Sequence, residues 1–308
     1  MSESISCRSC GGQDLDDLGP CPPFAASSTA ILGTSGRLLR CANCALGQRD
    51  PIPDAASLIA MYRDTPVEDM AYRFEDNAAW VRARKTMLER HNPARDLDVL
   101  DVGCHTGIFL AALPATWRRY GIESARAPVA VASQRHGVTI ISERLENTGS
   151  EWTQRFDAVT MFDVIEHLPN PAAGIAQAAR LLKPGGTLLL SSGDLDAWTW
   201  RWLGSGHWYL QTPQHLSVIS KRFLQHVANE NMLKLMEVQT IPHRLARRRE
   251  RWSEAIKAIY WGLRQRSGPY RIPHHLMQSL PGLTELRHMR SVPWTMSLQD
   301  HCLAVYGR

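Results

Sequence analysis

The sequence predicts an α/β fold in which a doubly wound, mainly parallel sheet follows a small cysteine-rich module. Strand-like apolar runs alternate with helical segments from Leu97 to about Ile241, which is typical of a parallel sheet with helices on both faces. A tight glycine turn follows the first of these strands, and two Cys-x2-Cys pairs lie in residues 1–50. We therefore expect a cysteine-rich domain over 1–50, a helical lead over 51–95 and an α/β domain over 96–308.

Length and charge narrow the functional class. The 308 residues can bury a sizeable core. Residues 241–308 hold twelve Lys/Arg against four Asp/Glu, a net charge of about +8. Because the whole chain has a net charge of +5, residues 1–240 have a net charge of about −3. A core without excess positive charge argues against a nucleic-acid track across the molecule. No apolar run reaches the roughly 18 residues that span a bilayer, and residues 1–7 lack signal-peptide features, so we expect a soluble, cytoplasmic protein.

The first 50 residues need a source of order other than a large core, because they are rich in Cys, Gly, Pro and Ser and show no long periodic segment. In a reducing compartment close cysteine pairs are metal ligands more often than disulfides. Cys7, Cys10, Cys41 and Cys44 form two Cys-x2-Cys knuckles that together complete a tetrahedral zinc site. Four unligated thiols are the alternative, since the thirty residues between the pairs exceed the usual ribbon spacing.

Helices and strands follow in a regular order. Residues 54–92 show helical spacing, first at Ala55, Leu58, Ile59 and Tyr62 and then from Trp80 onward, and Pro93 ends this region. Seven strands are expected, near 97–102, 117–122, 138–142, 156–161, 187–192, 234–240 and 301–306.

A segment foreign to the alternating pattern occupies residues 242–298. From about Leu245 to Leu263 its apolar residues recur at helical spacing between arginines, which describes a basic amphipathic helix. We expect its Trp252, Ile256 and Ile259 face to pack on the core or on a second subunit in a homodimer.

The turn after the first strand indicates a nucleotide ligand. The run from Val99 to Leu110 passes from an apolar strand through a glycine turn into a helix, as a nucleotide-binding βα unit does. A pyrophosphate fingerprint needs three glycines, whereas this turn has Gly103 but His105 and Ile108 at the other two places. The second strand ends in Glu123, whose carboxylate can accept hydrogen bonds from both hydroxyls of a ribose. A nucleoside without a diphosphate therefore fits best.

With these residues the segment resembles the class I S-adenosylmethionine-dependent methyltransferases, whose first motif reads acid-x-Gly-x-Gly-x-Gly and whose second strand ends in an acid. Residues 155–168 resemble that family's fourth strand and the turn after it, and residues 181–190 resemble its entry into strand five. The cysteine pattern, with Asp16–Gly19 between the knuckles, resembles the zinc-ribbon lead of a subgroup acting on sugars and secondary metabolites. The resemblance implies a Rossmann-like fold, a structural zinc and an insertion at 242–298 before an antiparallel last strand.

The resemblance also implies a cofactor site. Asp101, Gly103, His105 and Gly107 would lie under the methionine part, and Glu123 would bind the ribose. The remaining candidates are Ser142, Glu143 and Leu145 beside adenine, and Met161, Phe162 and Asp163 beside the methyl group. His105 departs from the family, which has glycine there. Asp101 could instead tie the amides of the turn together, and Tyr72 either closes over the cofactor or is a packing residue.

Methyl transfer is an in-line displacement, so positioning is its main requirement. A hydroxyl or carbon nucleophile also needs a base near neutral pKa. His167 and His215 are the candidates, although each could be a structural histidine bonded to a backbone carbonyl. The aromatic residues between Trp198 and Tyr209 either stack on an acceptor or pack the region.

The sequence favours methyl transfer to oxygen, or to carbon or nitrogen, of a small-molecule acceptor such as a sugar or specialised metabolite. The arginines of the inserted helix would then meet an anionic, nucleotide-linked acceptor, or they form an ordinary solvated face. Two other hypotheses stay open. One is an RNA or protein methyltransferase that docks its substrate through the zinc ribbon and the basic helix. The other is a non-catalytic zinc-ribbon protein with a degenerate cofactor fold.

Overall fold

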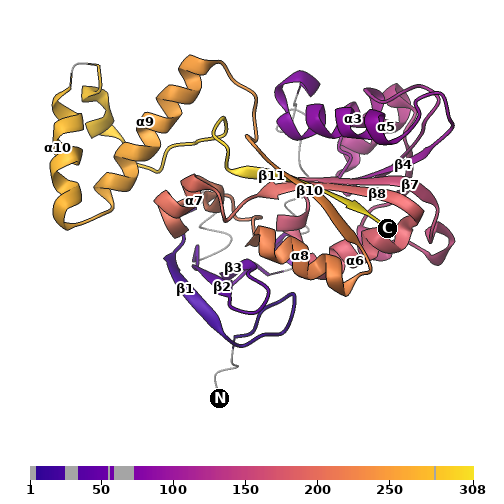
Figure 1. Cartoon of the computed structure of the whole chain (residues 1–308), viewed down its shortest axis with the longest axis horizontal. Coiled ribbons are helices and arrows are strands. Elements are labelled where there is room, and N and C mark those ends of the chain that lie inside the picture. Colours follow the sequence, from indigo (N-terminus) through magenta and orange to yellow (C-terminus); the bar gives the residue numbers. More distant parts are fainter. Residues whose placement is uncertain (1–4, 25–33, 55, 59–72, 281) are drawn as a thin grey trace.

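The computed structural model describes residues 5–24, 34–54, 56–58, 73–280 and 282–308. Ala55, Ile59, Tyr62 and Tyr72, which the sequence analysis singled out, lie outside these residues. A seven-stranded sheet in the order β10-β11-β8-β7-β4-β5-β6 organises most of the chain, and a four-stranded sheet in the order β1-β2-β3-β9 lies beside it (Figure 1).

The large sheet has the expected doubly wound, mainly parallel architecture. Its neighbouring strands β4, β5, β6, β7 and β8 are parallel, whereas β11 runs antiparallel to both β8 and β10. The strands are β4 (Asp98–Val102), β5 (Arg118–Ile122), β6 (Thr139–Ser142), β7 (Phe156–Phe162), β8 (Leu182–Gly193), β10 (Lys234–Ile241) and β11 (His301–Gly307). The predicted α/β fold class and its antiparallel last strand are confirmed.

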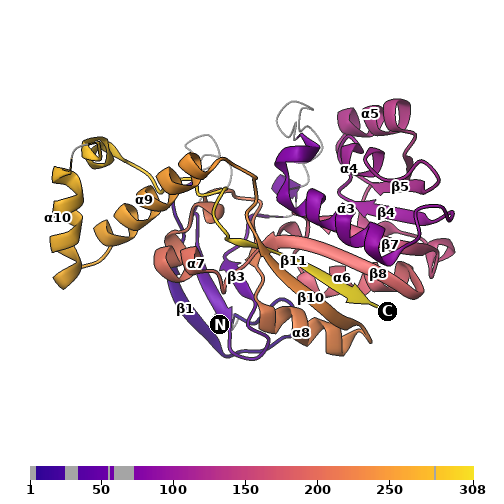
Figure 2. The same ribbon diagram turned by 45° about the horizontal axis from the view of Figure 1, so that its top comes forward.

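Helices cover both faces of this sheet (Figure 2). One face carries α3 (Ala78–Arg90), α4 (Ile108–Ala111) and α5 (Arg126–His136), and the other carries α6 (Pro171–Leu181) and α8 (Lys221–Glu230). Three of the helices begin at capping side chains that accept the backbone N–H three residues on: Asn77 before α3, Asn170 before α6 and Ser220 before α8. Strand residues alternate between the two cores, so that Met161 packs with α6 and Phe162 packs with α4.

The small sheet combines the N-terminal segment with a distant part of the chain. β1 (Leu15–Pro20), β2 (Arg37–Cys41) and β3 (Gly47–Asp50) form an antiparallel meander, and β3 then pairs with β9 (Ser217–Val218). Cys7, Cys41, Cys44 and Leu46 join the core that lies against α6 and α8. The cysteine-rich segment is thus packed on the α/β part of the chain.

Residues 242–298 project from one end of the molecule as two helices, α9 (Arg248–Arg264) and α10 (Arg271–Ser279) (Figure 1). The expectation that Trp252, Ile256 and Ile259 pack on the core is wrong, because Trp252 is 71% exposed and Ile259 is 40% exposed. The C-terminal half of α9 makes the contact instead. There Trp202 Nε1 donates to the carbonyl of Ala258 at 3.1 Å, and Gly262 leaves room for the indole ring.

The other helical elements are short. They are α7 (Trp198–Leu203) and the 3-10 turns at 74–76, 145–147, 150–152, 165–167, 204–206, 208–211, 268–270 and 284–288. Trp200, Trp208 and Tyr209 are buried together, so these three members of the aromatic stretch serve packing. None of the helices in the described residues is long and apolar enough to cross a membrane.

Candidate active site

The predicted site residues follow strands whose carboxyl ends meet at one edge of the large sheet. In open α/β sheets ligands bind at this edge. The glycine turn follows β4, Glu123 follows β5 and Asp163 follows β7. The antiparallel β11 begins at the same edge, because its first residue, His301, pairs with Gly193 at the end of β8. Segments far apart in the sequence therefore contribute to one site.

The turn after β4 has the backbone conformation of a glycine loop. Gly103 and Gly107 have φ values of 73° and 76°, and a Cβ at either position would lie under 3.0 Å from a valine methyl. His105 has a φ of 45°, so it adopts the left-handed conformation that glycine adopts freely, at a cost of roughly 1 kcal/mol. Its side chain is half-buried, and among the described residues its Nε2 atom has no hydrogen-bond partner.

Glu123 supports this turn directly. One carboxylate oxygen accepts the backbone N–H of His105 at 2.9 Å, and the other accepts that of Ala125 at 2.8 Å. Asp101 has a different role from the one considered above: its Oδ1 accepts the Thr160 hydroxyl at 2.6 Å across the sheet. Burial raises the pKa of Asp101 to about 7. The acid that ties a turn amide is therefore Glu123.

The other cofactor candidates differ in exposure. Glu143 is exposed, and the Ser142 hydroxyl donates to the Arg144 carbonyl at 2.8 Å. The side chains of Leu145 and Met161 are buried in the α6 core. Asp163 has a φ of 53° and stays partly exposed at the edge, while Phe162 packs edge-on against Phe109 with ring centroids 4.7 Å apart.

The structure brings the two predicted histidines together. Their ring centroids are 5.0 Å apart. The Nδ1 of His167 lies 3.0 Å from the carbonyl oxygen of Gln214, and the Nδ1 of His215 lies 2.7 Å from that of Tyr209. Buried Glu166 lies within 4.8 Å of both histidines and accepts the Tyr209 hydroxyl at 2.6 Å. Burial raises the pKa of Glu166 and lowers that of His215.

A second histidine group lies at this edge. His207, a weaker candidate from the sequence, lies 3.7 Å from Asp300. The other two histidines were missed by the sequence analysis: His243 follows β10, and His301 begins β11 beside Asp300. The Nδ1 of His243 lies 3.7 Å from an oxygen of Asp163. The available signal was the pair Asp300-His301 directly in front of an apolar strand, although nothing in the sequence relates it to Asp163.

Arg49 connects the small sheet to this site. Its side chain is fully buried. It donates to three backbone carbonyls in and just after η7 (Trp208–Gln211). These are the carbonyls of Leu210 at 2.6 Å, Thr212 at 3.3 Å and His215 at 3.1 Å. The segment that carries His215 is therefore held by a residue of β3.

The four predicted cysteines converge. The Sγ atoms of Cys7 and Cys44 are 3.6 Å apart, as are those of Cys10 and Cys41, and all four lie within 4.8 Å of one another. Tetrahedral zinc with Zn–S bonds of about 2.3 Å requires S–S separations of roughly 3.8 Å. The arrangement fits a zinc ion, which would have a structural role in a closed four-sulfur site.

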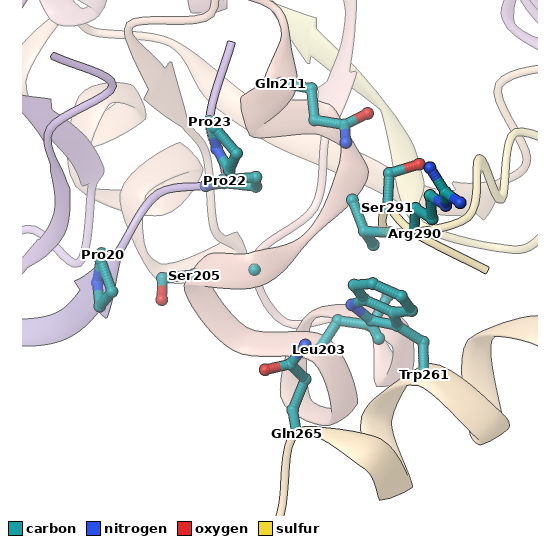
Figure 3. A pocket seen from close by; sticks show the side chains of 12 residues that line it. Pro20, Pro22, Pro23, Leu203, Ser205, Gln211, Trp261, Gln265, Arg290 and Ser291 are labelled. Carbon is teal, nitrogen blue, oxygen red and sulfur yellow. The ribbon is translucent and has the colours of Figure 1, made fainter. Parts of the chain in front are cut away.

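A cavity of about 430 Å³ lies between the small sheet and α9. Trp261 and Gln265 of α9 face Pro20, Gln211 and Arg290 across it (Figure 3). None of the candidate cofactor residues or of His167 and His215 lines this cavity, so it is separate from the carboxyl edge described above.

Comparisons with known proteins agree with this geometry. Residues 71–238, more than half of the chain, match the family model described as "Methyltransferase domain". Among the curated relatives, ubiquinone biosynthesis O-methyltransferase of Proteus mirabilis (strain HI4320) is 34% identical over 118 residues, which are 36% of this chain and 48% of the relative. The enzyme of the same name from Serratia proteamaculans (strain 568) is 31% identical over 136 residues, which are 42% and 56%. The chain spans about half the length of the curated relatives it matches.

Solved structures of methyltransferases are also similar to the chain. Magnesium protoporphyrin IX methyltransferase from Synechocystis PCC 6803 with bound SAH is 19% identical, with a TM-score of 0.43 over 52% of this chain and 74% of that one. Geranyl diphosphate methyltransferase in complex with GPP and sinefungin is 13% identical, with a TM-score of 0.44 over 74% and 78%. With its doubly wound sheet, its glycine turn and the matched family model, the chain belongs to the methyltransferase domain family.

Proposed function

We propose that the chain is an S-adenosylmethionine-dependent methyltransferase that methylates a hydroxyl oxygen of a small-molecule acceptor, which enters at the carboxyl edge. The observation that carries the proposal is that the glycine turn, Asp163 and several histidines share this edge. Oxygen is favoured over carbon or nitrogen because a hydroxyl must lose a proton and histidine is suited to take it. The relatives named ubiquinone biosynthesis O-methyltransferase support an oxygen acceptor. A specialised metabolite or sugar remains the proposed acceptor class.

The proposed cofactor contacts follow from the placement of the residues. Gly103, His105 and Gly107 would lie beneath the methionine part, and Glu123 would accept hydrogen bonds from the ribose. Ser142, Glu143 and Leu145 would border adenine, and Met161, Phe162 and Asp163 would border the methyl group. S-adenosylmethionine, when bound, supplies an electrophilic methyl group on sulfur. The protein must hold the acceptor oxygen in line with that group at about 3 Å.

His167 and His215 are the proposed residues on the acceptor side. Because Nδ1 of each ring lies against a backbone carbonyl oxygen, Nδ1 donates its proton there. In that tautomer the ring's lone pair is on Nε2. Both histidines can hold or orient the hydroxyl before transfer.

The basic segment after β10 is a proposed contact for an anionic acceptor. Arg244 and Arg247 line a recess of about 360 Å³ with Asp76 and Glu250. Replacing Arg247, Arg248 and Arg251 together with Gln should raise the acceptor KM and reduce its salt dependence while cofactor affinity stays unchanged. Unaltered acceptor kinetics would make these arginines an ordinary solvated surface.

The function is tested with methyl-labelled S-adenosylmethionine and a panel of catechols, other phenols, sugars and nucleotide-linked sugars. Mass spectrometry should show one class gaining a label on oxygen, and the Glu123→Ala variant should label it more slowly. RNA and a peptide mixture are included as competing acceptors. Label found only in RNA or protein, or cofactor binding without transfer to any small molecule, would contradict the proposal.

A further inference from the structure

We propose that Asp300 and His301 form the proton-accepting pair of the methyl transfer, with Nε2 of His301 as the atom that takes the proton. This inference rests on the proposed function, because it assigns the base for transfer to a hydroxyl. It names a residue at the start of β11 that neither the sequence motifs nor the comparisons identify.

Asp300 is fixed in place by its surroundings. One carboxylate oxygen lies 2.7 Å from Nδ1 of His301, and the other accepts Trp208 Nε1 and Thr295 Oγ1, each at 3.2 Å. Its backbone carbonyl accepts the Asp194 N–H at 2.8 Å. The carboxylate is fully buried. It therefore fixes both the orientation of the His301 ring and the position of the Nδ1 proton.

The other ring nitrogen of His301 is left for a ligand. Nε2 is buried and has no hydrogen-bond partner in the part of the chain that the structure describes. Buried polar atoms without a partner are rare in folded proteins. Since Nδ1 is committed to Asp300, Nε2 is the nitrogen that an acceptor hydroxyl can contact.

The pair lies close to the residues proposed for the methyl side of the cofactor. One ligand-type atom from each of Asp163, His243 and His301 lies within 4.8 Å of the others. The side chains of Asp163 and His243 are 26% and 12% exposed, whereas that of His301 is 2% exposed. His301 therefore lies at the inner end of a polar group that reaches solvent through Asp163.

The two histidines predicted from the sequence lack this arrangement. Nδ1 of His167 and Nδ1 of His215 each face a backbone carbonyl. Glu166 lies within 4.8 Å of both, but its two carboxylate oxygens accept the hydroxyls of Tyr209 and Ser192. His301 differs because a buried carboxylate, that of Asp300, lies directly against its Nδ1, as in a histidine that acts as a general base.

The transfer is balanced as follows. The acceptor oxygen forms a bond to the methyl carbon while the carbon–sulfur bond breaks. The electron pair of the broken bond stays on sulfur, so the sulfonium becomes a neutral thioether. The hydroxyl proton moves to Nε2 of His301, giving an imidazolium beside the Asp300 carboxylate. No further oxidant, reductant or co-reactant is needed.

The electrostatic surroundings agree with a base that works near neutral pH. Burial opposes a charged ring, but the charge and hydrogen bond of Asp300 outweigh it and raise the pKa of His301 above its ordinary value. Only the neutral ring accepts a proton, so activity should rise as pH increases through that pKa. The titratable groups that face His301 from the surrounding elements are Asp163, Glu166, Asp194, His207, Tyr209, His215, His243 and Asp300.

The test compares His301→Gln and Asp300→Asn with His167→Gln and His215→Gln in the full chain. Catechol serves as the probe acceptor beside any acceptor found in the panel. His301→Gln should lower kcat by about 10²- to 10⁴-fold, the range for loss of a general base, while calorimetry shows cofactor affinity within threefold of wild type. His226→Gln, on α8, should leave activity unchanged.

The pH profile separates a base from a merely structural residue. Asp300→Asn should move the acidic inflection of kcat/KM to lower pH, and His301→Gln should abolish that inflection. His167→Gln and His215→Gln should keep it. A His301→Gln enzyme with the wild-type inflection, or with kcat within threefold of wild type, would overturn the proposal. The proposal would also be overturned if wild-type activity strictly required an added divalent cation and His301→Gln abolished that requirement, because the histidine group would then be a metal site.

If the protein methylates no small molecule, the proposed function fails, and the Asp300–His301 pair must then be tested without turnover. NMR titration of the His301 ring in the apoprotein should give a pKa above 6.5 in wild type and a lower one in Asp300→Asn. An identical titration in both proteins would overturn the pair itself.

Discussion

Arg49 Nε lies 3.1 Å from the carbonyl oxygen of His215. This hydrogen bond joins β3 of the small sheet to the segment that carries one of the two histidines predicted from the sequence. Arg8 adds a parallel connection, since its guanidinium donates to the carbonyls of Arg49 and Leu216 at 2.9 and 2.6 Å. The N-terminal segment thus supports, through main-chain carbonyls, the segment that we propose for the acceptor side.

Replacing Arg49 with Ala should lower the free energy of unfolding by roughly 2–4 kcal/mol, the scale for leaving several buried carbonyls without donors. Acceptor KM should rise while cofactor affinity stays near wild type. Urea unfolding and steady-state kinetics measure both. Arg37→Ala is the control, because the Arg37–Asp17 pair in the same sheet is exposed and solvent screens it, so this substitution should leave the free energy of unfolding close to that of wild type. Equal effects of the two substitutions would refute the role of Arg49.

The purified protein should contain one zinc ion per chain. Cys41→Ala should lose it and unfold at a lower temperature, because Cys41 and Cys44 belong to the core against α6 and α8. Elemental analysis and thermal unfolding give the result. Cys21→Ala, at a buried cysteine outside the tetrad, should keep its zinc. A fully folded wild-type protein without metal would disprove the site.

Glu123→Ala should weaken S-adenosylmethionine binding by roughly 1.5–3 kcal/mol, the scale for lost hydrogen bonds to a charged group. Part of the loss comes from the ribose, and part comes from the His105 amide that Glu123 now holds. Calorimetry with the cofactor and its demethylated product gives the number. Glu146→Ala removes an exposed carboxylate paired with Arg144 and should change binding by less than about 0.5 kcal/mol.

Asp101 should make the stability depend on pH. Burial raises its pKa to about 7 from 3.8, so the folded state favours the protonated acid. This contribution to the free energy of unfolding is complete below pH 4 and is lost as pH rises through about 7. It amounts to at most roughly 4 kcal/mol. Asp101→Asn keeps an oxygen for Thr160 and should lack that fall between pH 5 and 8 in urea unfolding of the apoprotein. If the free energy of unfolding varies with pH in the same way in both proteins, Asp101 is not the source of the pH dependence.

Most of the large sheet could be predicted from the sequence, because its strands are apolar runs with clear boundaries. β4, β5, β6 and β10 begin and end within one residue of the expected positions. The exception is β8, which begins at Leu182 rather than 187, since the Lys-Pro-Gly-Gly stretch reads as a turn. β9 was missed because two residues carry no periodicity, and its pairing with β3 is a tertiary event.

The site was predictable only where its residues are local in sequence. The glycine turn and Glu123 follow directly from strand ends, and His105 adopts the glycine conformation expected of its motif position. The neighbours of His301 come from η7, from the segment after β10 and from the loop before β11, so their meeting depends on strand order. Packing of the Trp252, Ile256 and Ile259 face of α9 on the core was predicted wrongly, because helical spacing marks an apolar stripe without saying which half of the helix contacts the rest of the chain.

The pairing of β3 with β9 has a consequence for synthesis at the ribosome. Roughly 170 residues separate the two strands, and at about 5–20 residues per second their translation takes roughly 10–35 seconds. During that interval β3 can pair with β2 only, and its other edge is open to wrong pairing between nascent chains. Early metal capture by the cysteine knuckles would keep this three-stranded intermediate folded until its fourth strand emerges.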